Sequence, residues 1–388
     1  MPAMDHIRYL AETIGPRGST TPQEAEAARY AARVLKDLGL EPATEPFTSA
    51  RSAWYPYVLF TGLALLAEIL FWAAGRTGAV IAAVLMAVAL ASVLLELAFR
   101  PNPLRWLLPK GRSQNVWARR MPTGEARRNV VIMGHLDTHR TPLVFSTDRW
   151  VRLFSRLVPI GLTSAVALLV LFILGAAVPS LLWQLLSLPF ALVVLGVFLI
   201  TLQADFSPYT AGANDNATGA GIVLSLAERL SREPLAHTAV WLVLSGCEEV
   251  GCYGAEDFAR RHRHELGKAV WITLESAGGA HSSPAYLTRE TFLLTVPSDP
   301  QLLALAERIA ARHPEWDAHP YHFRGAYTEG SIAAKYGFRV LTITSHRRDG
   351  IFPEWHRPTD TVDRLDPQVV ENTEAFVWEL LQEIDRGA

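Results

Sequence analysis

Cysteine and charge are both scarce in this chain of 388 residues. The only cysteines are Cys247 and Cys252, so no disulfide framework stabilises the fold, and their CxxxxC spacing matches no zinc motif. We expect both to be small core residues. Charged residues make up 19% of the chain and the net charge is −2. With so little net charge, we expect no nucleic-acid partner. The N-terminal stretch, MPAMDHIRYLAETIG, lacks a continuous apolar run, and we therefore expect no secretory signal.

Hydrophobic residues, in contrast, make up 50% of the chain, and the mean hydropathy is +0.16. Four apolar segments carry this excess, each close to the length of about 17–25 residues that spans a bilayer. The last two contain no charged residue, which argues against long helices buried in a soluble core. Very short links join the segments in two pairs, so the sequence predicts two transmembrane helical hairpins. The segments are Tyr57–Ala74, Gly78–Phe99, Leu157–Ala177 and Leu181–Ala204.

A hairpin returns the chain to the side of the membrane that it left, so the polar segments are expected on one face. Arginine and lysine crowd the membrane ends on that face, whereas the opposite links carry only Arg76. The positive-inside rule then places the polar domain of this multi-pass protein of the cell membrane in the cytoplasm. The expected parts are polar residues 1–56, a hairpin at 57–99, polar residues 100–156, a hairpin at 157–204, and polar residues 205–388.

Two carboxylates fall inside the apolar segments. Glu96 lies four residues before Arg100, and we expect it to reach the interface and to be structural. Glu68 is nearer the middle of its segment. An ionisable residue at such a depth is a functional candidate, and its role stays open.

The polar segments alternate between strand-like and helix-like runs. Four short runs rich in β-branched residues indicate buried strands: NVVIM, TAVWLVLS, KAVWITL and RVLTIT. Three amphipathic runs predict helices: PQEAEAARYAARVLKDLG, DPQLLALAERIAARH and DPQVVENTEAFVWELLQEI. The sequence therefore predicts an α/β fold with a mostly parallel central sheet flanked by helices, interrupted by the two hairpins.

Side chains that bind metals follow these predicted strands at the points where the strands end. Because ligands of open α/β sheets bind in the crevice at the carboxyl ends of the strands, we expect the side chains to share one site. Two histidines and several carboxylates suit a hydrolytic metal centre. The residues concerned are His135 and Asp137 after NVVIM, Glu248 and Glu249 after TAVWLVLS, Glu275 after KAVWITL, His356 after RVLTIT and a loop, and Asp215 in the glycine-rich turn GANDNATGAG.

These motifs resemble those of the M28 zinc aminopeptidases. GHLDT, NDNATG, CEEVGCYG, LES and WHRPTDT occur in the family's order between residues 134 and 361. A single motif of this kind arises by chance in many proteins, whereas five in the correct order are specific. The resemblance covers most of the polar domain. It implies a zinc aminopeptidase-like fold, two co-catalytic divalent ions and hydrolysis of peptide bonds.

The resemblance also implies a ligand set for two Zn²⁺ ions, with Mn²⁺ or Co²⁺ as other divalent ions of such sites. Asp215 would bridge the two ions. One ion would take His135 and Glu275, and the other would take Glu249 and His356. A pair of ions about 3.5–4 Å apart needs such a bridging carboxylate.

Three further residues receive roles from the same resemblance. Glu248 would be the general base, which takes a proton from water and passes it to the leaving amine. Asp137 would hold the second nitrogen of the His135 imidazole. Tyr327 is a candidate for stabilising the oxyanion. The histidines at positions 139, 313, 319, 322 and 346 receive no role, and we expect them on the surface or in loops.

The sequence departs from the family pattern in three places. Glu275 stands where aspartate is usual, which leaves the metal spacing open. The family's late Ser-Asp-His segment appears as residues 327–331, YTEGS, so substrate contacts there do not carry over. Soluble members of the family also lack the hairpins.

We therefore expect a membrane-anchored metallopeptidase, in the first place an aminopeptidase, with a peptide substrate and the lipid bilayer as partners. The second hairpin separates His135 from Asp215, which leads to the hypothesis that the substrates are membrane-derived. Two alternatives stay open. One is a related zinc amidohydrolase or an enzyme that cyclises N-terminal glutamine, and the other is a non-enzymatic membrane receptor or scaffold with the same fold.

Overall fold

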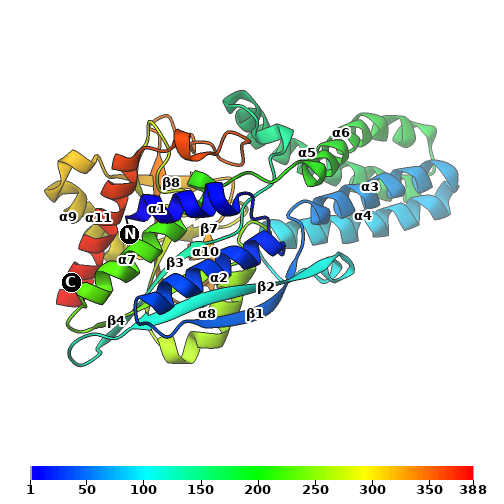
Figure 1. The fold of residues 1–388 in the computed structure, drawn as a ribbon. Helices are drawn as coiled ribbons and strands as arrows, with labels where there is room; N and C mark the ends of the chain where they lie inside the picture. The colour runs from blue at the N-terminus through cyan, green and yellow to red at the C-terminus, as the bar shows by residue number, and fades with distance from the viewer. Residues whose placement is uncertain (1, 388) are drawn as a thin grey trace. The chain divides into compact units, whose positions relative to one another are not determined.

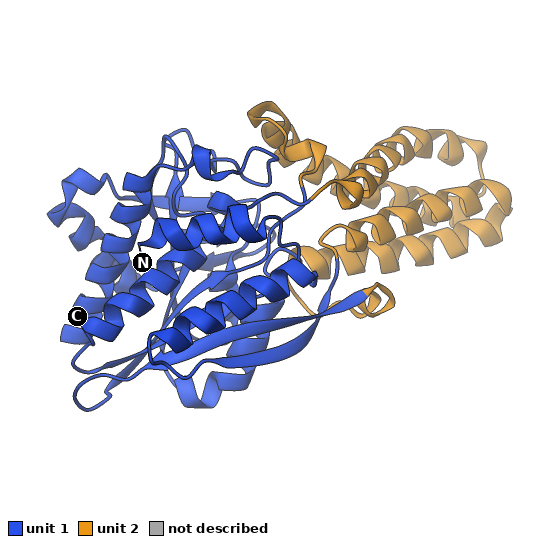
Figure 2. Cartoon of the chain, in the orientation of Figure 1, with its two compact units in different colours: residues 1–51, 110–140, 209–388 blue, residues 52–109, 141–208 orange. Residues whose placement is uncertain are grey.

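The computed structural model describes residues 2–387. The chain divides into two compact units, which Figure 2 shows in separate colours. Unit 1 comprises residues 1–51, 110–140 and 209–388, and unit 2 comprises residues 52–109 and 141–208. Each unit is therefore assembled from stretches that the other unit separates in the sequence.

Unit 1 is built around a nine-stranded sheet with the order β1-β2-β4-β3-β5-β9-β6-β7, in which β8 also pairs with β6 (Figure 1). The four central strands, β4, β3, β5 and β9, run parallel to one another. Every residue of β4 and β5 is buried, as expected for strands covered on both faces. The strands are β1 (Ala43–Ala50), β2 (Lys110–Arg120), β3 (Arg128–His135), β4 (Thr238–Ser245), β5 (Val270–Glu275), β6 (Ser283–Thr291), β7 (Thr295–Pro297), β8 (His319–Arg324) and β9 (Arg339–His346).

The prediction of a mostly parallel sheet is wrong, because the sheet is mixed. The apolar runs of the sequence identify only the four central strands, which are parallel. Antiparallel pairings join β1 to β2, β2 to β4, β6 to β7 and β6 to β9. These outer strands are only half-buried, as the alternating pattern of β1 shows, so they carry no apolar run that marks them.

Helices cover both faces of this sheet (Figure 1). One face packs its apolar side chains, among them Ile132 of β3 and Leu242 of β4, against α1, α2, α7, α9 and α11. On the other face, Trp241 and Trp271 contact Phe258 of α8. The helices of unit 1 are α1 (Ala3–Arg8), α2 (Pro22–Asp37), α7 (Gly219–Arg232), α8 (Tyr253–Leu266), α9 (Pro300–Arg312), α10 (Glu329–Lys335) and α11 (Pro367–Arg386).

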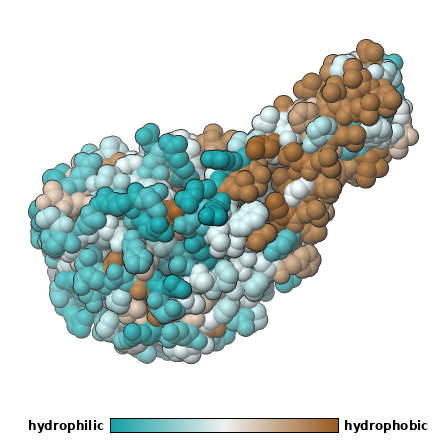
Figure 3. All heavy atoms as spheres, turned by 90° about the horizontal axis from the view of Figure 1, so that it is seen from above, coloured by the Kyte–Doolittle hydropathy of each residue, from teal (hydrophilic) through white to brown (hydrophobic). Residues whose placement is uncertain are grey.

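Unit 2 contains four helices that are long and apolar enough to cross a membrane. Large hydrophobic side chains are exposed along all four, and Figure 3 shows hydrophobic residues gathered on the surface of this unit, whereas that of unit 1 is mostly hydrophilic. A water-soluble bundle would turn such side chains inward. The helices are α3 (Tyr55–Ala73), α4 (Gly75–Leu97), α5 (Asp148–Ala177) and α6 (Leu181–Phe206).

The two glutamates of the apolar helices have partners within unit 2. Glu96 forms an ion pair with Arg105 and accepts a hydrogen bond from Asn102 Nδ2 at 3.1 Å, which fits a structural role near the helix end. Glu68 accepts hydrogen bonds from Trp72 Nε1 at 2.8 Å and from Ser187 Oγ at 2.7 Å. Glu68 therefore links α3 to α6 through a polar contact inside the bundle.

Candidate metal centre

The candidate site lies at the carboxyl ends of the central parallel strands. His135 is the last residue of β3 and pairs in register with Ser245, the last residue of β4. Glu275 is the last residue of β5, on the other side of β3. Because these strands are parallel and adjacent, their ends bring side chains from distant parts of the chain to one edge of the sheet.

Asp215 reaches this edge from a tightly held turn before α7. The turn begins at Gly212, where φ is +61° and an added Cβ would lie 2.5 Å from the Asp215 carbonyl oxygen, so glycine is required there. The Asp360 carboxylate accepts hydrogen bonds from the backbone N–H of Asn214 at 2.7 Å and of Asp215 at 3.0 Å. Asn216 donates to the Leu274 carbonyl at 2.7 Å, which ties the turn to β5.

A first cluster forms around the His135 imidazole. Its Nε2 lies 3.3 Å from Asp215 Oδ1 and 3.5 Å from Glu275 Oε2. Two ligand atoms that each bind a tetrahedral zinc ion at about 2.0–2.1 Å lie about 3.3–3.4 Å apart. The three side chains therefore have the spacing of co-ligands, and their candidate ligand atoms all lie within 4.8 Å of one another.

A second cluster forms around the His356 imidazole on the other side of Asp215. His356 Nε2 lies 3.4 Å from Asp215 Oδ2 and 3.3 Å from Glu249 Oε2. Asp215 therefore directs one carboxylate oxygen to each cluster. This is the arrangement that a carboxylate bridging two ions requires.

The surroundings of both clusters favour a bound cation. His135 Nε2 and Glu249 Oε1 are buried and make no hydrogen bond within the described residues, and orphaned polar atoms of this kind are costly without a ligand. Burial by itself lowers the pKa of His135, but neighbouring carboxylates, Glu275 foremost, outweigh it and hold the pKa well above its usual value. The excess of negative charge would thus attract a metal ion, and the donor set of imidazoles and carboxylates suits zinc.

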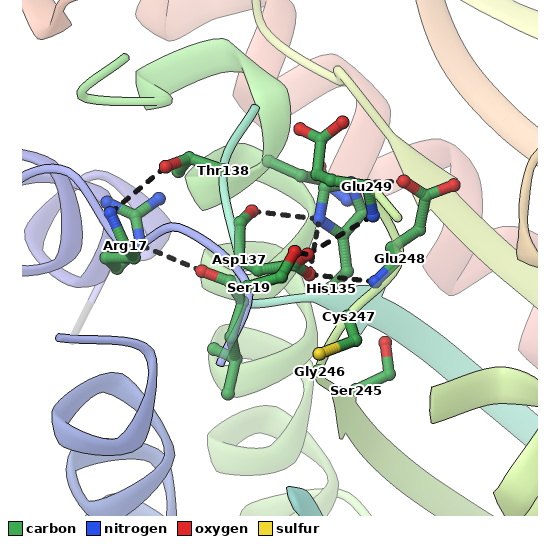
Figure 4. A network of polar contacts seen from close by, with 12 residues as sticks. Arg17, Ser19, His135, Asp137, Thr138, Ser245, Gly246, Cys247, Glu248 and Glu249 are labelled. Atoms are coloured by element: carbon green, nitrogen blue, oxygen red, sulfur yellow. Dashed lines mark hydrogen bonds and ion pairs between the residues drawn. The ribbon is translucent and has the colours of Figure 1, made fainter. Parts of the chain in front are cut away.

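Asp137 orders the backbone of the Glu248–Glu249 turn (Figure 4). Its carboxylate accepts hydrogen bonds from the N–H of Glu248 at 3.0 Å and of Glu249 at 3.2 Å, and from Ser19 Oγ at 2.6 Å. The nearest partner of His135 Nδ1 is the Asp137 backbone carbonyl at 3.0 Å, and the carboxylate is 3.5 Å away. The Asp137 backbone carbonyl thus contacts the His135 imidazole, whereas its carboxylate fixes the backbone of Glu248 and Glu249.

Glu248 stands at the edge of the first cluster rather than within it. Its Oε2 lies 3.9 Å from His135 Nε2, farther than the oxygens of Asp215 and Glu275. Its Oε1 accepts a hydrogen bond from Cys252 Sγ at 3.2 Å. Burial, with the nearby Glu275 adding to it, raises the pKa of Glu248 well above its usual value. This is a poor position for a ligand and a good one for a group that exchanges protons.

Tyr327 is engaged with a different part of unit 1. Its hydroxyl donates to the Leu294 carbonyl at 2.6 Å and accepts from the Leu294 N–H at 2.7 Å. The side chain is buried and fastens the hairpin between β6 and β7. The oxyanion role stays a prediction, and it requires this hydroxyl to leave the Leu294 backbone.

Arg17 is the main residue of the site that sequence reasoning misses. It is fully buried and donates to five backbone carbonyls, which are those of Leu10, Gly15, Leu136, Ala211 and Gly212. Leu136 lies between His135 and Asp137, and Gly212 opens the turn that carries Asp215, so one guanidinium holds both segments. Nothing in the sequence near Arg17 signals this role, because Leu136, Ala211 and Gly212 lie more than a hundred residues away along the chain.

Glu24 and Asp360 are missed as well. Glu24 accepts hydrogen bonds from the Cys247 N–H at 2.9 Å and from Ser113 Oγ at 2.9 Å, and burial raises its pKa to about 8. It supports the turn before Glu248, although in the sequence it looks like a residue of the first helical turn. Asp360 does have a signal, because it belongs to the motif WHRPTDT.

The expectation for the unassigned histidines is wrong for His319 and His346, which are buried in strands β8 and β9. His139 lies in a loop, as expected, but is also buried. His139 stacks on the ring of His356, with centroids 3.7 Å apart, and it can form a metal-binding group with Glu249 and His356. The sequence motif GHLDT ends one residue too early to include it.

Comparison with known proteins gives a family match in the second half of the chain. The model of Peptidase family M28 matches residues 196–381, which include Asp215, Glu248, Glu249, Glu275 and His356. The match covers just under half of the chain, and together with the fold it supports an M28 family metallopeptidase. No curated protein sequence matches the chain.

Solved structures share the fold at low sequence identity. A leucine aminopeptidase precursor from Bacteroides thetaiotaomicron has a TM-score of 0.58 and 13% identity, covering 98% of this chain and 95% of its own. A glutaminyl cyclase from the same organism has a TM-score of 0.58 and 13% identity, with coverages of 98% and 96%. A zinc aminopeptidase from Bacillus subtilis has a TM-score of 0.57 and 13% identity, with coverages of 98% and 94%. At these identities the likeness establishes the fold alone.

Proposed function

We propose that this protein is a metallopeptidase with two divalent ions, most simply Zn²⁺, and that it removes N-terminal residues from peptides. The observation that carries the proposal is the position of Asp215, whose two oxygens face His135 and His356 at 3.3 Å and 3.4 Å. In this proposal His135, Asp215 and Glu275 hold one ion, and Asp215, Glu249 and His356 hold the other.

The residues of the site divide the chemistry among them. Ions held in this way polarise a scissile carbonyl and lower the pKa of water at the site. Glu248 accepts one proton from the attacking water and delivers it to the departing amine as the carbon–nitrogen bond breaks. The products are a carboxylic acid and a free amine, and Glu248 returns to its starting state. Asp137 and Glu24 keep Glu248 in place by holding the backbone of its turn.

The main alternative is an enzyme that cyclises N-terminal glutamine. Its support is the glutaminyl cyclase fold, which matches this chain as well as the aminopeptidase folds do. A cyclase needs no water as nucleophile, because the substrate's own amine attacks its side-chain amide. The two activities therefore release different products from one peptide that begins with glutamine.

A substrate panel tests the proposal. The full chain, purified in detergent and loaded with Zn²⁺, is given leucine and glutamine p-nitroanilides, the N-acetylated leucine compound, and a peptide that begins with glutamine. We expect release of p-nitroaniline from the free-amine compounds but not from the blocked one. Formation of a pyroglutamyl peptide with release of ammonia would instead favour the cyclase. If the protein turns over none of these substrates and binds no metal, a receptor or scaffold is favoured instead.

We also propose that unit 2 anchors the enzyme in the membrane, with unit 1 in the cytoplasm and with membrane-derived peptides as substrates. The support is the apolar exposed surface of α3–α6 and the position of the second hairpin in the sequence, between His135 and Asp215. A variant with short linkers in place of both hairpins tests the substrate preference. If it folds and cleaves membrane-derived and soluble peptides in the wild-type ratio, the anchor plays no part in selecting them.

A further inference from the structure

The first turns of α5 carry an arginine stripe, formed by Arg149, Arg152 and Arg156, that the proposed function leaves unexplained. Successive members are three and four residues apart, so they lie on one face of the helix. All three residues are exposed, and their guanidinium groups form no ion pair or hydrogen bond within residues 2–387. Like charges at this spacing repel one another and weaken a helix. An anion from outside the chain would offset this repulsion.

The packing of α5 determines which way the arginine stripe faces. On the opposite side of the helix, Phe154 contacts Phe145 of the same unit, with ring centroids 5.4 Å apart. On the face of the stripe, four residues after Arg156, Ile160 is 47% exposed. Because residues four apart lie one above the other on a helix, the arginine stripe continues directly into the exposed apolar surface of α5.

The length of α5 places the arginine stripe at the level of the lipid headgroups. The helix has 30 residues, which at 1.5 Å each give about 45 Å, whereas the hydrocarbon core of a bilayer is about 30 Å thick. Residues 148–156 contain every charged residue of the helix, and its apolar run begins at Leu157. With that run in the hydrocarbon core, the stripe lies just outside it.

Exposed aromatic side chains lie at the same end of unit 2. Because α5 and α6 form a hairpin, Phe206 at the end of α6 lies at the end where α5 begins, and it is 78% exposed. Trp54, just before α3, contacts Phe145, just before α5, with centroids 6.5 Å apart, so the hairpin of α3 and α4 opens at this end too. The segment that follows α4, η2 (Pro103–Leu107), carries Trp106, which is 74% exposed. Exposed tryptophan is typical of a membrane–water interface.

We propose that the arginine stripe binds the headgroup of an anionic phospholipid whose acyl chains lie along Ile160 and the apolar surface beyond it. Guanidinium groups form paired, charge-assisted hydrogen bonds with phosphate oxygens, and basic residues next to a membrane attract anionic lipids. The inference rests on the proposed membrane anchoring of unit 2, but not on the metal centre. In a simpler role, the stripe only keeps this end of α5 on one side of the membrane and selects no lipid.

A charge-matched comparison separates the two roles. The arginine variant carries Arg149→Gln, Arg152→Gln and Arg156→Gln in the full chain. In the control variant, three exposed basic residues of unit 1 that form no ion pair within the described residues are changed instead, namely Arg263→Gln, Lys268→Gln and Arg308→Gln. Both variants lose three positive charges, and thermal unfolding in detergent checks that each of them folds.

Lipid binding is measured by microscale thermophoresis of the detergent-purified proteins. Each protein is titrated with dioctanoyl phosphatidylglycerol and, separately, with dioctanoyl phosphatidylcholine. We expect the wild type and the control variant to bind phosphatidylglycerol more tightly than phosphatidylcholine. In the arginine variant we expect the affinity for phosphatidylglycerol to fall about 100-fold, since each basic residue near an anionic lipid surface contributes about five-fold.

The other outcomes overturn the inference in distinguishable ways. If the arginine variant binds phosphatidylglycerol as tightly as the wild type, or the wild type binds both lipids equally, the stripe selects no lipid, while the proposed anchoring stands. If inorganic phosphate displaces phosphatidylglycerol completely, the ligand is free phosphate rather than a lipid. If an alkaline carbonate wash releases the wild type from cell membranes, the proposed anchoring fails, and the inference fails with it.

Single substitutions decide the question if the arginine variant does not fold. Arg152→Gln, in the middle of the stripe, should lower the affinity for phosphatidylglycerol about five-fold. Arg152→Lys keeps the charge and should lower it less. Equal affinities of the wild type and Arg152→Gln would contradict the inference.

Discussion

Individual side chains at the candidate site show which roles a sequence can reveal. His135, Asp215, Glu249, Glu275 and His356 were predictable because each lies in a short motif next to a strand end or turn. Arg17 and Glu24 were not, because Arg17 contacts Leu136 and Ala211, more than a hundred residues away, and Glu24 contacts Ser113 and Cys247, which are also distant in the sequence. His139 escaped notice because a single histidine is uninformative until its neighbours are known. Candidate ligands can thus be recognised from local patterns, whereas the residues that position them cannot.

Glu248 provides the most direct test of the chemistry. We expect Glu248→Gln to lower kcat by about 10²–10⁴-fold, the usual contribution of a general base, because the amide cannot take up the proton. Metal content should stay at the wild-type value, since Glu248 stands 3.9 Å from His135 at the edge of the cluster. Kinetics and elemental analysis of the same sample check both points.

The matched control for that substitution is Glu315→Gln, because the Glu315 side chain is exposed and pairs only with His313 among the described residues. It should leave kcat and metal content unchanged. A near-wild-type rate in Glu248→Gln would remove Glu248 from the role of base.

His346 gives rise to a pH dependence that is independent of the metal ligands. It is buried against Tyr321 and Phe352, and burial, together with the nearby His319, lowers its pKa to about 3. Below pH 6.5 the unfolded chain protonates this histidine while the folded chain does not, so stability is lost as the pH falls from 6.5 towards 3. Above pH 6.5 both states are neutral and the effect vanishes.

We therefore expect the free energy of unfolding to fall less from pH 7 to pH 5 in His346→Phe than in the wild type. The difference amounts to at most about 2 kcal/mol, because pH 5 lies about 1.5 units below the unfolded pKa. Thermal unfolding of both proteins at the two pH values measures it. An identical loss in the two proteins would show that His346 does not titrate in this way.

Among the elements, the sequence reveals the strands that are almost fully buried and the helices that have one buried, apolar face. The strands β3, β4, β5 and β9 and the helices α2, α9 and α11 were predictable from apolar runs or amphipathic periodicity. β1, β2, β6, β7 and β8 were not, because an outer strand such as β2 mixes exposed and buried positions along KGRSQNVWARR. The antiparallel half of the sheet depends on long-range pairing, which local composition does not encode.

The start of α9 illustrates how one residue fixes an element to the sheet. Asp299 caps the helix by accepting from the N–H groups of Gln301 and Leu302, each at 3.0 Å, and it also pairs with Arg339 of β9 at 3.0 Å. We expect Asp299→Ala to destabilise the protein by about 1–2 kcal/mol, mostly from the lost cap, because the ion pair is partly exposed and contributes less.

Chemical denaturation of the full chain in detergent measures this change, with Asp363→Ala as the control. Asp363 is largely exposed, its ion pair with Arg364 is long, at 3.8 Å, and it caps no helix. An equal effect of the two substitutions would mean that the cap contributes nothing.

At the scale of the whole molecule, the orientation of the apolar unit is open to direct test. In the proposed topology the link between α3 and α4 faces outward, and unit 1 faces the cytoplasm. We expect Thr77→Cys, an exposed position in the first turn of α4 next to that link, to react in intact cells with a maleimide that cannot cross membranes. Cys247 and Cys252 are buried, which keeps the background low.

Met121→Cys is the matched probe on unit 1, since Met121 is 49% exposed. It should react only after the membrane is permeabilised. Reaction of both cysteines from outside, or of neither, contradicts the proposed orientation.

The five carbonyl partners of Arg17 impose an order on the folding of this chain. Arg17 leaves the ribosome among the first residues, but Ala211 and Gly212 emerge only after all four apolar helices have been synthesised. Until then the guanidinium lacks the contacts that make its burial tolerable, and the candidate site lacks Asp215. Under the proposed function, the metal centre would therefore be completed only after the last hydrophobic segment has been made.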